Sequence, residues 1–468
     1  MVKEPSETWS RSRSPWRGHL LLAPLVLLLG CGGIGEPPRT AASSGGAGGG
    51  GTTGTPPTGL VGAPLAFSPT AHGFGLNAVV AQGDPPLLVA HVRAAGTATW
   101  SDLAAATARG TDVAQWWFEG LAAGLRYEYE ILAPDAGGQV RLYSGSAVTQ
   151  RPPGDSFTFA LITDSHIGAD LEFSNQGDPT VLATVSAEVD AAAPDFVLHL
   201  GDMLDFHQYG FNDPPPDATV TRAAYLNYRT LLGDTIGRAA HFATIGNWEG
   251  EDGTYTAEEF ERSLSQRFLY VPNPSPATYP ESGNANQDYY AFTWGDALFI
   301  VLNVMSYTST AHLLGTYPGL PDDWTLGAAQ LAWLQMTLAN ATSKWRFLCI
   351  HHAVGGAAGD DINSAYGRGG GQAAYVGEQA RVHQLMLQYG AQIFFYGHDH
   401  VFADMEVDGI RYTLPGNAGA IWMFSPAETG YTESWLEYGW GRVTVSPEQV
   451  HVQFLKMGGE MLYEYTVP

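Results

Sequence analysis

Five short motifs carry side chains of the kinds that bind metal ions, and each follows a run of apolar residues. The donors are carboxylate, amide and imidazole groups without a thiolate, a mixture that favours Mn, Fe, Zn or Ni over copper(I) or an iron–sulfur cluster. One tetrahedral ion cannot use so many donors, so we expect two ions that share a carboxylate and leave a position open for water. Two ions about 3.5–4 Å apart suit the in-line hydrolysis of phosphoesters. The motifs are Asp164-Ser165-His166, Gly201-Asp202-Met203-Leu204-Asp205, Gly246-Asn247-Trp248-Glu249, His351-His352 and Gly397-His398-Asp399-His400.

The apolar runs must position these motifs. They are short, bounded by turn residues and separated by helical stretches, which is typical of buried parallel strands. Open α/β sheets bind ligands outside the carboxyl ends of such strands, so motifs that are far apart in the sequence can converge on one site. In Asp164-x-His166 and His398-x-His400, alternate residues of an extended segment face the same side, so two ligands arrive together. The runs are 157–163, 196–200, 241–245, 346–350 and 391–396.

Each motif also has an ordinary structural explanation. An Asp before a helix is a common N-cap, and Gly-Asp, Gly-Asn and Gly-His are frequent turn pairs. The joint pattern of motifs at successive predicted strand ends is what favours a site.

The order and spacing of the motifs resemble those of the calcineurin-like metallophosphoesterases over about residues 155–425, and residues 330–352 look like the purple acid phosphatase branch. The resemblance implies an α/β fold, a four-layer α/β/β/α sandwich, with two divalent or trivalent ions, of which Mn, Fe and Zn are favoured. It implies that Asp202 bridges the ions, and that His351 is a ligand because it directly follows its strand, with His352 as the alternative. It further implies that a first ion is bound by Asp164, His166 and His400, and a second ion by Asn247, His351 and His398. Catalytic roles are expected for Asp202, Asn247, Glu249 and His398.

Three positions depart from the family pattern. Relatives usually have His in place of Trp248, and that His is thought to protonate the leaving group or bind the phosphoryl oxygen. Indole can only donate a hydrogen bond. Three explanations therefore stay open: His207 or Glu249 supplies the acid, only substrates with good leaving groups react, or Trp248 packs a wall of the cleft. Purple acid phosphatases have Tyr in place of Asp205, so no coloured iron–tyrosinate is expected, and Asp205 is expected to orient a ligand histidine. His166, which those phosphatases usually lack, indicates the wider phosphoesterase pattern.

Charge narrows the class of partner. The chain has 468 residues, with 22 Lys and Arg against 47 Asp and Glu, and a net charge of −25. No basic patch is visible, so a nucleic acid partner is not expected. An acidic body repels polyanions, which leaves metal ions to attract a small phosphoester substrate.

The N-terminus has the pattern of an export signal. Arg11, Arg13 and Arg17 precede the apolar residues 20–29, a run shorter than the roughly 20 residues that cross a bilayer. Leu28-Leu29-Gly30-Cys31 follows and resembles a bacterial lipoprotein cleavage site, which makes 1–31 the signal peptide and Cys31 the lipidated first residue. The alternative is an ordinary secretory signal with a chance cysteine. We expect a protein anchored by lipid in the bacterial cell envelope, with the outer membrane or the cell surface favoured.

Composition divides the remaining chain into three parts. Residues 32–58 are rich in Gly, Thr and Pro and are predicted to be a flexible linker. Residues 59–151 are predicted to form a small β-sandwich, and 120–132, with alternating tyrosines, resemble a fibronectin type III strand pair. We expect Trp116 and Trp117 to be core residues rather than a carbohydrate-binding surface. The strands expected in this part are 87–92, 97–100, 115–119, 127–132 and 140–143.

Residues 155–468 are predicted to be the catalytic domain. Asn303 is expected in a turn, Arg368 lies in a Gly-rich loop (355–371) that should edge the cleft, and the alternating segments 401–414 and 441–465 are expected in a second sheet. The expected helices are 180–193, 223–232, 328–338 and 378–389.

The combined expectation is a secreted, lipid-anchored phosphoesterase that hydrolyses small phosphomonoesters by attack of a metal-activated hydroxide. Two alternatives stay open: a phosphodiesterase of the same fold, and a surface protein that binds metal or phosphate without turnover. Trp248 favours both alternatives, whereas the full ligand set opposes the second.

Overall fold

The computed structural model describes residues 55, 57–171, 176–206, 216–307, 325–352, 378–425, 431 and 433–468. The predicted signal peptide, most of the predicted linker, His207 and the loop with Arg368 lie outside these residues. Residues from Thr52 to Pro468 form one compact unit. Among the described residues, no helix combines the length and the apolar character that crossing a bilayer requires.

The first sheet contains the strands that precede three of the motifs. β10, β11 and β12 run parallel, with Phe159 beside Phe196 and Phe196 beside Ala240. All four residues of β11 are buried, which explains why these strands are mostly apolar rather than alternating. The strand order is β22 (Met461–Val467), β21 (Val450–Lys456), β20 (Gly439–Val445), β10 (Phe157–Ile162), β11 (Phe196–His199), β12 (Ala240–Ala243), β2 (Leu65–Thr70), β3 (Gly73–Gln82), β7 (Val113–Glu119) and β6 (Thr107–Arg109), with β1 (Gly59–Leu60) paired to β3.

The second sheet contains the strands before the two histidine motifs and packs on the first sheet. Phe159 of β10 lies between the sheets, with its ring 5.0 Å from Phe196 of its own sheet and 5.0 Å from Phe299 of the other. The strand order is β13 (Tyr290–Trp294), β14 (Ala297–Val301), β15 (Trp345–Cys349), β16 (Ile393–Phe395), β18 (Ile410–Pro415), β17 (Phe402–Val407) and β19 (Ser434–Trp435).

One sheet assignment from the sequence is wrong. The segment 401–414 does lie in the second sheet, but 441–465 forms β20 to β22 of the first sheet, where β20 pairs antiparallel with β10. Alternation of apolar and polar residues predicts strands but not which of two facing sheets they join, because both sheets offer the same buried inner face.

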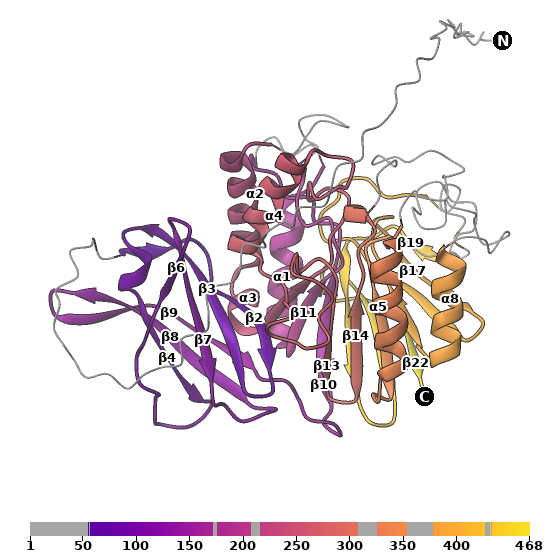
Figure 1. The fold of residues 1–468 in the computed structure, drawn as a ribbon, viewed down its shortest axis with the longest axis horizontal. Coiled ribbons are helices and arrows are strands. Elements are labelled where there is room, and N and C mark those ends of the chain that lie inside the picture. Colours follow the sequence, from indigo (N-terminus) through magenta and orange to yellow (C-terminus); the bar gives the residue numbers. More distant parts are fainter. Residues whose placement is uncertain are drawn as a thin grey trace, which may run out of the picture. The chain divides into compact units, whose positions relative to one another are not determined.

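Helices cover the outer faces of the two sheets (Figure 1). On the first sheet lie α1 (Pro179–Ala192), α2 (Ala218–Leu232) and α3 (Thr235–Arg238), with α4 (Ala257–Tyr270) against α2; on the second lie α5 (Gly327–Asn340) and α8 (Glu378–Tyr389).

The helix ends follow from local capping. Asp217 accepts hydrogen bonds from the N–H groups of Thr219 and Val220, so α2 begins five residues before the expected 223. Helix α4 was not expected from the sequence, although Thr256 and Glu259 form a capping box at its start. The prediction for α8 is confirmed at both ends. Asn303 does sit in a turn, because its Oδ1 accepts from the N–H of Met305 at the start of the 3₁₀ helix η3 (Met305–Tyr307).

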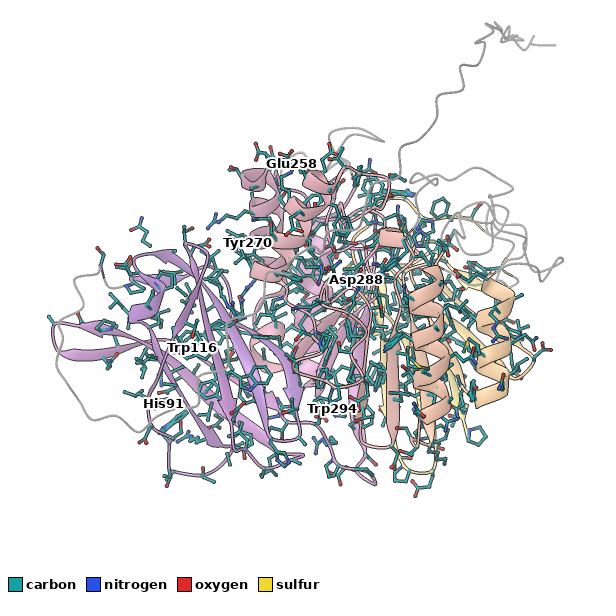
Figure 2. All side chains as sticks on the ribbon, in the orientation of Figure 1. His91, Trp116, Glu258, Tyr270, Asp288 and Trp294 are labelled. Atoms are coloured by element: carbon teal, nitrogen blue, oxygen red, sulfur yellow. The ribbon has the colours of Figure 1, made fainter. Side chains whose placement is uncertain are left out.

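A third, small sheet packs on the N-terminal strands of the first. It consists of β5 (Ala104–Ala105), β4 (Val89–Ala94), β8 (Arg126–Asp135) and β9 (Gly138–Val148), and a 3₁₀ helix η1 (Pro85–Leu87) precedes β4. Trp116 faces this core at 4% exposure, which confirms it as a core residue (Figure 2). Trp117 is partly buried against the apolar cluster on the helix side of the first sheet. The expected strand 97–100 is absent from this described segment.

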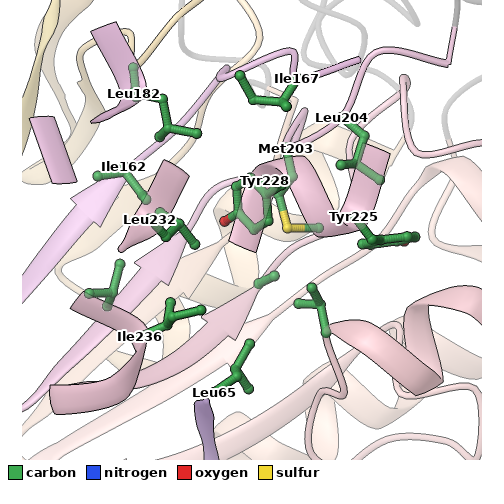
Figure 3. Packing of buried hydrophobic residues seen from close by; sticks show 14 of the residues in the cluster. Leu65, Ile162, Ile167, Leu182, Met203, Leu204, Tyr225, Tyr228, Leu232 and Ile236 are labelled. Atoms are coloured by element: carbon green, nitrogen blue, oxygen red, sulfur yellow. The ribbon is translucent and has the colours of Figure 1, made fainter. Parts of the chain in front are cut away.

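The N-terminal strands share a sheet and a core with the rest of the unit. β2 pairs parallel with β12 at Phe67 and His241. Leu65 of β2 belongs to the same apolar cluster as Ile162 of β10 and Leu232 of α2 (Figure 3). The predicted parts 59–151 and 155–468 are therefore continuous in this structure.

Arg229 of α2 ties the two parts together through buried polar contacts. It is fully buried, and its guanidinium donates to Asn77 Oδ1 at 2.6 Å and to the carbonyls of Asn77, Ala63 and Tyr270. We predict that Arg229→Met lowers the free energy of unfolding by about 3 kcal/mol, because buried acceptors that lose their donor cost about 1–3 kcal/mol each. Urea unfolding measures the loss.

The matched control is Arg222→Met on the same helix. Arg222 is 41% exposed and pairs with Asp112, so its loss should cost under about 1 kcal/mol. Equal losses in the two variants would show that the carbonyls around Arg229 find other donors.

Candidate metal centre

The motifs meet where the carboxyl ends of strands from two facing sheets come together. Asp164, Asp202 and Asn247 follow β10, β11 and β12 of the first sheet, whereas His351 and His398 follow β15 and β16 of the second. The convergence predicted from the sequence is present, and it lies where the two sheets meet.

Four side chains form the first donor cluster. Ligand atoms of Asp164, His166, Asp202 and His400 all lie within 4.8 Å of one another. His166 Nε2 is 3.2 Å from His400 Nε2 and 3.5 Å from Asp202 Oδ2, and His400 Nε2 is 3.6 Å from Asp164 Oδ1. All four are buried, so lone pairs of nitrogen and oxygen face each other away from bulk water.

A second cluster adjoins the first through Asp202. His351, His352 and His398 offer nitrogens within 4.8 Å of one another. The amide atom Oδ1 of Asn247 lies 3.2 Å from His351 Nε2 and 3.0 Å from His398 Nδ1. His351 Nε2 is also 2.9 Å from Asp202 Oδ2, so Asp202 touches both clusters.

The structure distinguishes His351 from His352. Nδ1 of His351 lies 2.7 Å from the carbonyl oxygen of Leu200, which places the proton on Nδ1 and aims Nε2 at the cluster. His400 is oriented in the same way, with Nδ1 2.9 Å from the carbonyl of Trp422. This geometry favours His351 as the ligand, although His352 is close enough to contribute, with its ring 4.2 Å from that of His398.

The ligand-bearing loops have strained backbones. Asp164, His166, Asp202, His398 and His400 all have positive φ, between 49° and 80°. Each such non-glycine residue costs on the order of 1–3 kcal/mol and persists only where its surroundings hold it. The loops after β10 and β11 hold one another, since the N–H of Asp164 donates to Gly201 and that of His166 donates to Asp202.

The glycines of the three motifs that contain one allow the loops to approach closely. A Cβ at Gly201 would collide with the ring of His351, one at Gly246 with Asp202, and one at Gly397 with Thr163. These glycines are therefore needed for the site to assemble, which a simple turn pair does not require.

Electrostatics show why the donors fit a cation. Burial raises the pKa of Asp164 to about 8 and raises that of Asp202 well above its usual value, with the Asp205 charge contributing to the second shift. Burial lowers the pKa of His400 to about 3. The site thus disfavours both carboxylate charges and imidazolium, and a divalent cation bound by neutral imidazoles would compensate the carboxylates.

Glu249 is held by backbone N–H groups, and its expected catalytic role stays a prediction. Its carboxylate is fully buried and accepts N–H groups from two loops: Oε1 from Met203 at 2.5 Å and Leu204 at 3.2 Å, and Oε2 from Gly246 at 2.5 Å and Asp202 at 3.2 Å. Burial and the nearby Asp202 charge raise its pKa to about 8. A side chain held in this way links the loop after β11 to the loop after β12.

Three aromatic residues border the clusters. Trp248 is 5% exposed, its ring lies edge-on to His166 at 4.9 Å, and its backbone N–H donates to Asp202 Oδ1 at 2.9 Å. Trp422 lies 4.6 Å from His400, and Phe424 lies 5.5 Å from it. Trp422 and Phe424 were not expected at the site, because their signal in the sequence is only an apolar run, 421–424, after the glycines at 416 and 419.

Two further site predictions, for Asp205 and His207, stay untested. Asp205 is fully buried beside the loop after β10, and its backbone N–H donates to the carbonyl of Ile167. Its charge contributes to the raised pKa of Asp202. Its expected contact with a ligand histidine stays a prediction. His207 lies outside the described residues.

This fold and donor set define a class of protein, the metallophosphoesterases. Residues 157–402 match the family of calcineurin-like phosphoesterases, and the chain belongs to this family.

Relatives agree with this assignment. Tartrate-resistant acid phosphatase type 5 of Oryctolagus cuniculus is 19% identical over 182 residues, which cover 37% of this chain and 52% of the relative. The chain thus spans about half the length of this curated relative. The structure of PhoD superimposes with a TM-score of 0.66 at 16% identity, covering 90% of each chain. Purple acid phosphatase from yellow lupin (Lupinus luteus) superimposes with a TM-score of 0.60 at 13% identity, covering 86% of this chain and 74% of that one.

Proposed function

We propose that this protein hydrolyses small phosphomonoesters at a centre of two metal ions, with Mn, Fe and Zn as the favoured metals. The observation that carries the proposal is the position of Asp202, whose Oδ2 is 2.9 Å from His351 Nε2 and 3.5 Å from His166 Nε2. One oxygen therefore faces donors of both clusters, as a bridging ligand requires. The first ion belongs to Asp164, His166 and His400, and the second to Asn247, His351 and His398.

Two bound ions supply an activated water and neutralise the charge that develops on phosphorus. The chain's own residues orient this chemistry. Leu200 and Trp422 hold the imidazoles of His351 and His400 through their carbonyl oxygens. The amide of Asn247 and Nδ1 of His398 converge at the second cluster, and burial of the ligands keeps bulk water away.

The test is metal analysis combined with hydrolysis of phenyl phosphate and bis-phenyl phosphate, with Mn, Zn or Fe supplied. Two ions per chain and faster turnover of the monoester are expected. Faster turnover of the diester would establish the alternative function, a phosphodiesterase, which Trp248 favours. Two ions without turnover would establish a binding protein, and absence of metal would refute both ideas.

Trp248 gives the second test. We predict that Trp248→His raises the rate on an alkyl phosphomonoester about tenfold or more, because general acid catalysis typically contributes 10²–10⁴-fold and indole cannot protonate a leaving alkoxide. Steady-state kinetics on ethyl phosphate and phenyl phosphate measure the effect, which should be larger for the alkyl ester.

Trp248→Phe is the control, since it keeps a ring beside His166 without adding a proton donor. A rate in Trp248→His that is unchanged or lower would mean that another residue already supplies the acid.

We further propose that the sheets and helices form a four-layer α/β/β/α sandwich, and that the N-terminal strands are a fibronectin III-like module. The support is the core shared by the two large sheets, the helices on their outer faces, and the small sheet packed on β2, β3 and β7. Arg229 of the catalytic part donates to the side chain and the carbonyl of Asn77 in this module, and through such contacts the module supports the catalytic part.

The proposed location is the bacterial cell envelope, with lipid on Cys31. We predict that Cys31→Ala moves the protein from the membrane to the soluble fraction, because stable anchoring depends on its acyl chains. Fractionation followed by immunoblotting measures this. Cys349→Ala, which changes the buried cysteine of β15, is the matched control and should stay with the membrane. A Cys31→Ala protein still on the membrane would refute the lipid anchor.

A further inference from the structure

We infer that the site selects phosphomonoesters of planar, uncharged aromatic alcohols, and that Trp422 and Phe424 are the residues that recognise the ring. This inference rests on the proposed function, since it assumes that a phosphoryl group binds at the two donor clusters.

The segment that carries both aromatic residues is fixed against the ligand loops. After β18, the N–H of Ala418 donates to the carbonyl of Thr163 and that of Ala420 donates to Asp164, both at 2.8 Å. The N–H of Ile421 donates to Gln176 at 3.0 Å. These hydrogen bonds are made by the backbone, so they fix the segment before Trp422 and Phe424 whatever side chains it carries.

The rings of Trp422 and Phe424 reach both donor clusters. Trp422 lies 5.1 Å from His166 and 4.6 Å from His400, edge-on in both cases. Phe424 lies 5.5 Å from His400 and 6.4 Å from His398. A phosphoryl group held between these histidines therefore has its ester substituent beside aromatic surface.

The same surface opens toward solvent. Trp248 is nearly buried at 5% exposure, with its ring 5.6 Å from Trp422, whereas Trp422 and Phe424 are partly exposed and Ile421 is 53% exposed. The wall thus runs from the ligand histidines outward and offers aromatic faces and edges that favour stacking with a flat ring. The net charge of −25 opposes substituents that carry further phosphates.

An independent observation indicates the same substrates. The residue beside His166 and Asp202 is Trp248, which cannot protonate a leaving oxygen. When water attacks, its oxygen forms the new bond to phosphorus and the bond from phosphorus to the ester oxygen breaks. An aryl oxide takes that electron pair readily and is protonated afterwards by solvent, whereas an alkoxide needs a proton as it leaves.

The test compares binding of phenylphosphonate and methylphosphonate, which are not hydrolysed, to the metal-loaded protein by calorimetry. The wild type should bind phenylphosphonate about five- to tenfold more tightly, the range expected for one aromatic pair. Trp422→Leu should reduce this ratio to near one, and Trp422→Phe should keep most of it. Trp333→Leu is the matched control: Trp333 is a partly buried tryptophan on α5 that contacts Tyr289 instead of the site, so the ratio should not change.

Each outcome separates the inference from the proposed function. If neither phosphonate binds the metal-loaded protein, the proposed function fails. If both bind with equal affinity to the wild type, the function stands and the aromatic selection is refuted. If Trp422→Leu weakens both equally, Trp422 only supports His400, and its role in recognition is refuted.

Discussion

Asp202→Asn should remove metal binding and turnover together. We expect the metal content to fall from two ions per chain to one or none, and kcat for phenyl phosphate to fall at least about 1,000-fold, the loss typical of removing a strong electrostatic contributor. The reason is the single oxygen, Oδ2, that lies 2.9 Å from His351 Nε2 and 3.5 Å from His166 Nε2. An amide of the same size carries no negative charge, so it cannot replace the carboxylate as a bridge between two cations. Elemental analysis and steady-state kinetics measure the two losses.

Stability distinguishes a lost ligand from a damaged fold. Burial disfavours the charge on Asp202, since it raises the pKa of this carboxyl well above its usual value. Without metal, Asp202→Asn should therefore be at least as stable as the wild type. With metal at 100 times its dissociation constant, the wild type should gain about 2.7 kcal/mol per site, and the variant should gain less. A metal-free variant that is much less stable than the wild type would show that Asp202 supports the fold rather than the ions.

The convergence of the candidate ligands could be predicted from the sequence because its signals are local. A buried parallel strand is a short apolar run, and a candidate ligand follows it closely, as Asp164 follows β10 and His351 follows β15 with one residue between in each case. The family resemblance then ordered the ligands, and the structure brings Asp164, His166, Asp202 and His400 within 4.8 Å of one another.

What could not be predicted depends on contacts between distant segments. Alternation in 441–465 indicates strands, but only the tertiary fold decides that β20 pairs with β10 rather than with the second sheet. The same holds for β2, which pairs with β12 through one residue pair. The placement of Trp422 depends on backbone bonds from Ala418 and Ala420 to the loop after β10, and nothing in the local sequence specifies them.

Glu249 has a local signal in the sequence, but its role depends on contacts between distant segments. Its type and spacing were visible in Gly246-Asn247-Trp248-Glu249, but its role depends on four N–H donors from two separate loops. We predict that Glu249→Gln lowers the free energy of unfolding by about 3–5 kcal/mol, because one end of the amide must face two N–H donors with its own N–H₂ group, and each buried donor left without an acceptor costs about 1–3 kcal/mol.

The same change should lower kcat about 100-fold, because displacement of a ligand loop by about 1 Å is enough for a loss of that size. Urea unfolding and kinetics on phenyl phosphate measure both effects. Glu251→Gln is the matched control: Glu251 is as buried as Glu249, but it pairs with Arg267 at 2.6 Å rather than with the ligand loops. It should lower stability and leave kcat within about twofold, since breaking a buried ion pair costs about 3–5 kcal/mol wherever it lies. Equal losses of kcat in the two variants would mean that general destabilisation, and not the bridge between the loops after β11 and β12, accounts for the effect of Glu249.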